Sequence, residues 1–418
     1  MTLESADPTP GRAANHTADL TLEPIIYLVF GVFLLLLGGL LFKIGTGELP
    51  YNQDSTYGIL LVITSIYAIT TGKTQFGDFN RSWFLVFLAF FAAVVGTLAC
   101  LVPGFLSGAV QVLTGLLLLV GGIMLFLQLV IAKDKARLWI TIPGILQHLA
   151  IACAIVYLME ILLGFVTLFP SITTAPIIGI LCILSGISFF YLAWCVRKAV
   201  FAYPTNVTPV PGAAAGRHFI FRDPLLTPSI ILLLMMGIII LIVAFLMIPL
   251  AIGILSSYSH DSQYGLLLVI MALQVMILGE TPFGVRTHSL LLILAGLVFA
   301  GFGMVSCIVP GLLSGVMLAL LGIWNLIAGF FGLVNLYRPI ISEIRHPQAE
   351  PAPVPPIIKK LLFSITLLQL VTILFGINML VPDFIPGLLV LIILFIMAFL
   401  IINVAYIQTR LPAPERPA

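Results

Sequence analysis

The sequence predicts an all-α, polytopic membrane protein of about 12 transmembrane helices, arranged as two parallel six-helix repeats built of helical hairpins. Hydrophobic residues make up 61% of the chain and charged residues only 8%, far from the composition of a soluble domain. Apolar runs long enough to cross a bilayer recur along its whole length. The stretch 54–122 also recurs without a gap as 261–329, with roughly 27 of 69 aligned residues identical. A net charge of +2 gives no reason to expect nucleic acid as a partner.

Twelve spans follow from the apolar runs. The first is preceded by a polar tail that lacks the basic residues of a cleaved signal peptide, so we expect the first span to remain as an anchor. The predicted spans are 24–45, 56–73, 82–102, 106–132, 140–168, 175–197, 226–254, 264–279, 289–309, 312–337, 358–381 and 385–407.

Lysine and arginine gather in alternate connections between these spans. Of the 18 basic residues, only Lys43 falls on the opposite side of the membrane from the others. Because cytoplasmic loops carry the excess of basic residues, the pattern predicts a plasma-membrane protein with both termini in the cytoplasm.

The chain divides into two halves of six spans, joined by a linker rich in proline and alanine. Six is an even number, so both halves insert the same way up and the repeat is parallel. The predicted segments are a cytoplasmic tail (1–23), the first repeat (24–200), the cytoplasmic linker (201–225), the second repeat (226–407, with a cytoplasmic loop at 338–357) and a second tail (408–418).

The best-matched part of the repeat is a Pro-Gly turn. It reads Cys-Leu-Val-Pro-Gly-Phe-Leu-Ser-Gly at 100–108 and Cys-Ile-Val-Pro-Gly-Leu-Leu-Ser-Gly at 307–315. We expect proline to end one helix, glycine to allow the reversal and serine to cap the next helix. An anion-binding nest of backbone amides is the alternative function for this turn. The turn residues are Pro103, Gly104, Ser107, Pro310, Gly311 and Ser314.

Small residues recur every seven positions in the second helix of most hairpins. Seven residues make close to two helical turns, so each series forms a stripe along one face. In lipid such stripes let helix backbones approach closely, and we expect them to be packing surfaces. The alternative, a glycine-lined permeation path, would need a polar lining that these faces lack. The best-matched stripes are Gly108, Gly115 and Gly122, and Gly315, Gly322 and Gly329.

These hairpins resemble the short repeat of the HdeD family of acid-resistance membrane proteins. The most similar stretches are 290–334 and 84–127, and 163–193 is similar more weakly. Members of that family typically have six spans, so this chain looks like two such units fused. The resemblance implies a fold and a broad role in stress, and it supplies no catalytic residues. The greater length and the proline-rich linkers depart from the family.

A second resemblance gives the competing function. The Val-Pro-Gly-x-Leu-Ser-Gly turns at 102–108 and 309–315 look like the Pro-Gly-x-Ser-Gly turns of polyprenyl-phosphate translocases. Here one residue is inserted before the serine, and cysteine replaces the acidic residue before the turn. The short apolar cores at 57–71 and 264–278 occupy matching places in the two halves, which also favours a transporter. This alternative is a transporter or translocase of a small or lipid-linked substrate, with its site between the halves.

Candidate chemistry is sparse. Glu160, with Tyr157 one turn before it, is the clear intramembrane carboxyl, and we interpret it either as a proton or substrate site or as a neutral carboxyl hydrogen-bonded to a neighbour. Mid-span amides are interpreted as links between helices; they are Gln111, Gln274, Asn325, Gln369 and Asn403. No catalytic or metal-binding motif is found, so we expect no enzymatic activity, no cofactor and no metal.

The expected partner is the lipid bilayer. A homo-oligomer is left open, and the sequence names no protein partner. Cys100 and Cys307 occupy equivalent places in the two halves. We expect these cysteines to lie beyond disulfide distance, because a small residue before the turn accounts for both.

Overall fold

The computed structural model describes residues 22–71, 83–131, 144–202, 228–255, 257–278, 290–345, 356–381 and 384–410. Within these ranges the chain forms twelve α-helices and one short 3-10 helix, with no β-strand. Nine of the described helices are long and apolar enough to cross a membrane. The chain is therefore a multi-pass helical membrane protein, as predicted.

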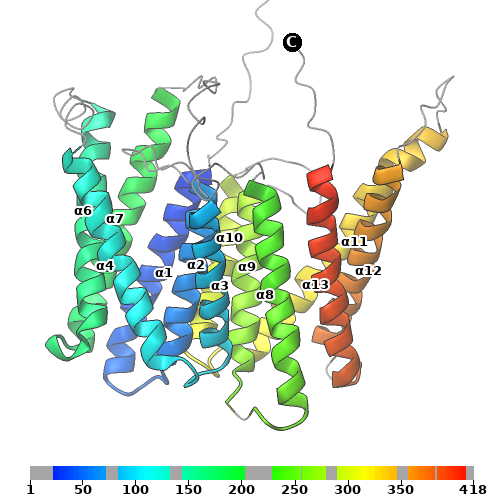
Figure 1. Ribbon diagram of the computed structural model, residues 1–418, viewed down its shortest axis with the longest axis horizontal. Helices are drawn as coiled ribbons and strands as arrows, with labels where there is room; N and C mark the ends of the chain where they lie inside the picture. Colours follow the sequence, from blue (N-terminus) through cyan, green and yellow to red (C-terminus); the bar gives the residue numbers. More distant parts are fainter. Residues whose placement is uncertain are drawn as a thin grey trace, which may run out of the picture.

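Every described α-helix overlaps a predicted span, and Figure 1 shows how the helices are arranged. The largest difference is at α11, which continues eight residues past the predicted end of its span, so part of the expected loop 338–357 is helical. The helices are α1 (Leu22–Gly45), α2 (Gln53–Thr71), α3 (Trp83–Leu101), α4 (Ser107–Ile131), α6 (Ile145–Leu168), α7 (Ala175–Ala202), α8 (Pro228–Ala251), α9 (His260–Leu278), α10 (Leu290–Ile308), α11 (Ser314–Arg345), α12 (Pro356–Leu380) and α13 (Gly387–Arg410), with the 3-10 helix Pro170–Ile172 before α7.

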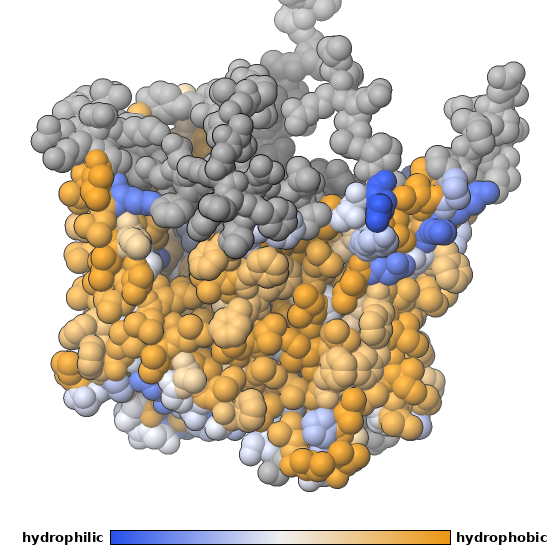
Figure 2. Space-filling model, viewed as in Figure 1, coloured by the Kyte–Doolittle hydropathy of each residue, from blue (hydrophilic) through white to orange (hydrophobic). Residues whose placement is uncertain are grey.

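The helices form one broad layer of packed pairs. Helices α2 and α3 pack together near the centre beside α9 and α10, while α4, α6 and α7 lie at one end and α11 to α13 at the other (Figure 1). Apolar side chains cover the sides of the bundle, and polar side chains gather at its two ends (Figure 2). Large rings such as Phe87, 67% exposed, and Phe330, 60% exposed, face outward, as expected of a surface in contact with lipid.

The Pro-Gly turns reverse the chain as predicted, and an aspartate of the same half holds each one. Gly104 and Gly311 have φ angles of 88° and 84°, which favour glycine. The amide of Gly104 donates to Asp54 Oδ2 at 2.7 Å, and the amide of Gly311 donates to Asp261 Oδ2 at 2.8 Å. One amide of each turn therefore already binds an anion, which is a carboxylate of the protein itself.

The predicted serine caps are wrong. Ser107 donates to the carbonyl of Gly104 at 3.4 Å, and within the described residues no helix amide donates to Ser107 or Ser314. The first intrahelical bond of α4 runs from the amide of Val110 to the carbonyl of Leu106, so Leu106 occupies the cap position. Each serine lies one residue too late to cap its helix.

Most of the predicted glycine stripe is a packing surface. A Cβ added at Gly115 would lie 2.7 Å from Leu168 of α6, and one added at Gly322 would lie 2.6 Å from Leu380 of α12. Gly122 and Gly329 are likewise tight against α6 and α12. The prediction was wrong for Gly108 and Gly315, whose added Cβ atoms would meet nothing within 4 Å. These two residues stand in the first turn of their helices, before the paired helices come together.

Candidate functional site

The contact between the two halves is built from pairs of residues 207 positions apart. The side-chain oxygens of Ser55 and Ser262 lie 3.0 Å apart and buried. Two main-chain bonds cross the contact reciprocally: the amide of Asn52 donates to Ile308 at 3.0 Å, and the amide of Ser259 donates to Leu101 at 2.9 Å. The segment before α2 therefore satisfies a carbonyl at the end of α10, and the segment before α9 does the same for α3.

Cys100 and Cys307 meet in this contact, contrary to expectation. Their sulfur atoms lie 3.8 Å apart, and both thiols are free and fully buried. Each cysteine before a turn therefore faces the other across the contact, with no exposed surface. Leu101 and Ile308, next in sequence, have no exposed surface either. The residues that meet between the halves at this level are closely packed and bonded to one another.

Glu160 and Tyr157 lie one turn apart on α6, at the far end of the first half from this contact. Tyr157 is buried in the apolar core, close enough to Tyr67 of α2 for an electrostatic interaction. The Cβ atom of Glu160 lies against Gly122 of α4. Its carboxylate forms no hydrogen bond with a described residue, so the expected bonded neighbour is not found there.

Two of the five mid-span amides connect helices as predicted. Gln111 of α4 donates to the carbonyl of Thr167 in α6 at 2.8 Å, and Asn403 of α13 donates to Ser364 of α12 at 2.9 Å. The other three amides lie elsewhere. Gln274, Asn325 and Gln369 all line one cavity in the second half.

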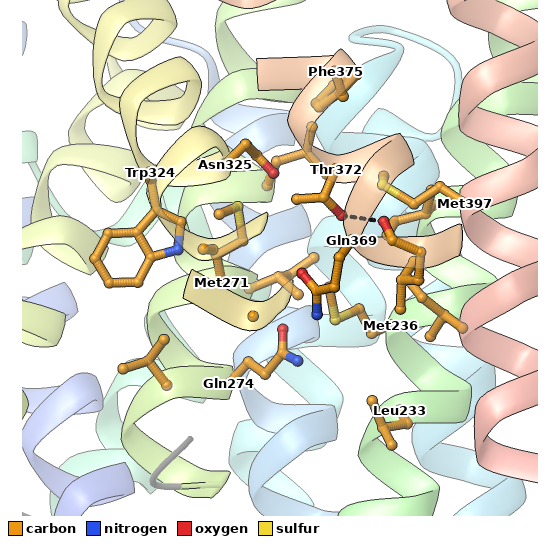
Figure 3. A pocket seen from close by; sticks show the side chains of 18 of the residues that line it. Leu233, Met236, Met271, Gln274, Trp324, Asn325, Gln369, Thr372, Phe375 and Met397 are labelled. Atoms are coloured by element: carbon orange, nitrogen blue, oxygen red, sulfur yellow. Dashed lines mark hydrogen bonds between the residues drawn. The ribbon is translucent and has the colours of Figure 1, made fainter. Parts of the chain in front are cut away.

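This cavity has a volume of about 530 Å³ and is lined by residues of α8, α9, α11, α12 and α13. Half of its lining residues are leucine, isoleucine or methionine, and Phe375 and Trp324 are the aromatic members (Figure 3). The volume lies within the roughly 300–1,000 Å³ typical of small-molecule sites. No charged side chain is among its described lining residues.

The polar groups of the cavity converge from three helices. Gln274 of α9 and Gln369 of α12 point toward one another across it (Figure 3), and neither side chain bonds to a described residue. The amide of Gln369 packs on the backbone at Gly332, where an added Cβ would lie 2.6 Å from it. Asn325 donates to the carbonyl of Leu321 at 2.7 Å, and Thr372 donates to that of Leu368 at 2.8 Å. Each of these last two therefore offers an oxygen to the cavity.

Such an arrangement can bind a ligand through hydrogen bonds. Carboxamides donate and accept hydrogen bonds without titrating near neutral pH, so they hold a ligand and do not move protons. Within the described residues, no group of three histidine, cysteine, aspartate or glutamate side chains could hold a metal ion. Sequence reasoning noticed Gln274 and Gln369 singly and missed that they face each other. Comparison of the chain with protein-family models, curated proteins and solved structures finds no match.

Proposed function

We propose that this chain is a non-enzymatic plasma-membrane protein in which two HdeD-like six-helix units are fused, and that it supports the cell envelope under stress. The closed contact between the halves carries the proposal. Ser55 meets Ser262 there, and Cys100 meets Cys307, all buried. A contact whose polar groups bond to one another fits a structural assembly better than an alternating-access cleft.

Deleting the gene in its native host tests this role. Survival after an acid challenge is expected to fall and to return when the wild-type chain is expressed. Variants in which a helix contact is disrupted are expected to restore survival less well, in proportion to their loss of stability. Unchanged survival of the deletion strain under acid and other envelope stresses would remove the stress role.

A transporter is the second candidate function, favoured by the cavity of about 530 Å³. The described lining of that cavity belongs to the second half alone, so the site differs from the one expected between the halves. Transport would be shown by uptake or release of a solute from proteoliposomes containing the purified chain, measured against protein-free vesicles.

A further inference from the structure

The cavity of the second half lies where the first half is filled by aromatic rings. The repeat places Tyr67 opposite Gln274. Helix crossings extend the comparison: α1 meets α7 at Gly31 and Gly186, and α8 meets α13 at Gly237 and Ala398. Counting from these crossings gives the remaining correspondences, which are Tyr27 with Leu233, Phe30 with Met236, and Phe189 with Ile401.

The crossings of α6 and α12 add one more pair. Gly164 of α6 packs against Gly115, and Gly376 of α12 packs against Gly322. Counting back from these glycines places Tyr157 opposite Gln369. The second half therefore has a smaller or more flexible residue at each of five positions that are aromatic in the first half, and all five line the cavity.

In the first half four of these rings, Tyr27, Phe30, Tyr67 and Phe189, form a packed cluster. Phe30 stacks on Phe189 with ring centroids 5.5 Å apart, and Tyr67 lies 5.8 Å from both Tyr27 and Phe30. The hydroxyl groups of Tyr27 and Tyr67 lie 3.3 Å apart, so each provides a partner for the other. In the first half the rings thus occupy this space and the hydroxyls of Tyr27 and Tyr67 are partners of one another, whereas in the second half a space remains and the carboxamides of Gln274 and Gln369 bond to no described residue.

We propose that the cavity binds an uncharged amphipathic small molecule, with its hydrocarbon body against the apolar wall and a neutral hydrogen-bonding head between Gln274 and Gln369. The binding site does not depend on the envelope role proposed above, nor on whether the ligand is moved across the membrane.

The lining decides the charge of the ligand. A charged head in this interior would have no counter-charge among the described lining residues, and desolvating it without one is costly. A neutral head loses little on entering and gains bonds. Because each carboxamide both donates and accepts, the best complement is a group that does the same, such as another amide. The oxygens of Asn325 and Thr372 add acceptors to the same space.

Three brominated probes of equal chain length test the proposal: 8-bromooctanamide (neutral), 8-bromooctanoate (anionic) and 8-bromooctylamine (cationic). Trp324 lines the cavity and can report on bromine quenching once Trp83, Trp139 and Trp194 are replaced by phenylalanine. In lipid nanodiscs at neutral pH, the amide probe alone is expected to quench Trp324 with saturation. Equal, unsaturated quenching by all three probes would mean partition into lipid and would overturn the proposal.

Substitutions of the lining glutamines then test whether the ligand binds in this cavity. Gln274→Tyr installs the ring that the first half has in the corresponding place, and Gln369→Leu removes one carboxamide. Each is expected to weaken binding of the amide probe about tenfold or more, while Gln111→Leu, outside the cavity, changes nothing. Gln369→Glu is expected to allow the cationic amine probe to bind, because the new carboxylate supplies a counter-charge. Full binding by folded Gln274→Tyr and Gln369→Leu chains would overturn the site. Binding is measured on purified protein and the stress role is measured as survival of cells. Loss of probe binding would therefore leave the stress role untouched, and loss of the stress role would leave the binding site untouched.

Discussion

The sulfur atoms of Cys100 and Cys307 lie 3.8 Å apart, and the oxygens of Ser55 and Ser262 lie 3.0 Å apart beside them. Each pair joins residues at equivalent positions of the repeated stretches 54–122 and 261–329. The two stretches thus touch at equivalent points, where α2 and α3 meet α9 and α10.

The thiol pair should cross-link on oxidation. Copper-phenanthroline is expected to join Cys100 to Cys307, because their sulfur atoms need only a small movement to bond. With a protease site inserted in the linker 203–216, the cleaved halves should stay together on a non-reducing gel and separate on a reducing one. Cys100→Ala is the control. Complete separation of the oxidised, cleaved wild-type halves would contradict the geometry.

The crossing of α2 and α3 should not tolerate even a methyl group. A Cβ added at Gly58 would lie 2.5 Å from the carbonyl oxygen of Gly96 and 2.7 Å from the amide of Cys100, and neither backbone atom can move aside alone. We expect Gly58→Ala to destabilise the protein by about 1–3 kcal/mol. Gly39→Ala, where the added atom meets nothing within 4 Å, is the matched control. Thermal unfolding in detergent measures both; equal melting temperatures would be inconsistent with this close approach.

The aspartate at the second Pro-Gly turn should contribute to stability through the bond that its side chain accepts from Gly311. Asp261→Ala removes the acceptor for the amide of Gly311, 2.8 Å away, and is expected to cost about 1 kcal/mol at this exposed position. Asp261→Asn keeps an acceptor oxygen and should cost less. The order wild type, Asn, Ala in melting temperature is the expected result, and a more stable alanine variant would argue against an anchoring role.

Glu160 separates the two candidate functions. If the chain is a structural assembly, Glu160→Gln should keep both its melting temperature and acid-survival rescue. Gly322→Leu and Gly115→Leu should each lose stability by about 1–3 kcal/mol, because their neighbours on α12 and α6 leave no room. A Glu160→Gln chain that melts like wild type but no longer rescues survival would favour a transporter coupled through this carboxyl.

The orientation in the membrane can be checked by cysteine labelling. We expect single cysteines at 53, 259 and 383 to react with an impermeant thiol reagent from outside, and those at 135, 208 and 350 only after the membrane is opened. Of these positions only 53 and 259 lie within the described residues. Labelling at 208 from outside would reverse the predicted topology.

The sequence was sufficient to predict the helices and where they reverse. Their bounds follow from apolar length, and Gly104 and Gly311 follow from a turn that requires a positive φ. The serine caps depended on register within one turn. Ser107 was expected to cap α4, yet Leu106 occupies the cap position, and one residue is finer than any apolar pattern resolves.

The site was harder to predict, because it depends on how helices rotate against one another. Gln274 and Gln369 lie on different helices, and apart from its glycine stripe an apolar helix gives no periodic sign of which face meets its neighbour. The shared Asp-Ser-x-Tyr-Gly motif was visible at 54–58 and 261–265, but its aspartate has a role only once the Pro-Gly turn lies beside it. Comparing the halves residue by residue at the crossings would have marked Tyr67 and Gln274 as a replacement of ring by amide.

The reciprocal bonds from Asn52 to Ile308 and from Ser259 to Leu101 describe an isologous interface, the kind that joins identical subunits about a two-fold axis. In a homodimer of one six-helix unit, every substitution would appear twice. A change that emptied the aromatic cluster would hollow both subunits together. Joining two copies in one polypeptide removes that constraint. One copy can keep its interior filled while the other exchanges rings for amides, so the symmetric surface is retained and the interiors are free to diverge.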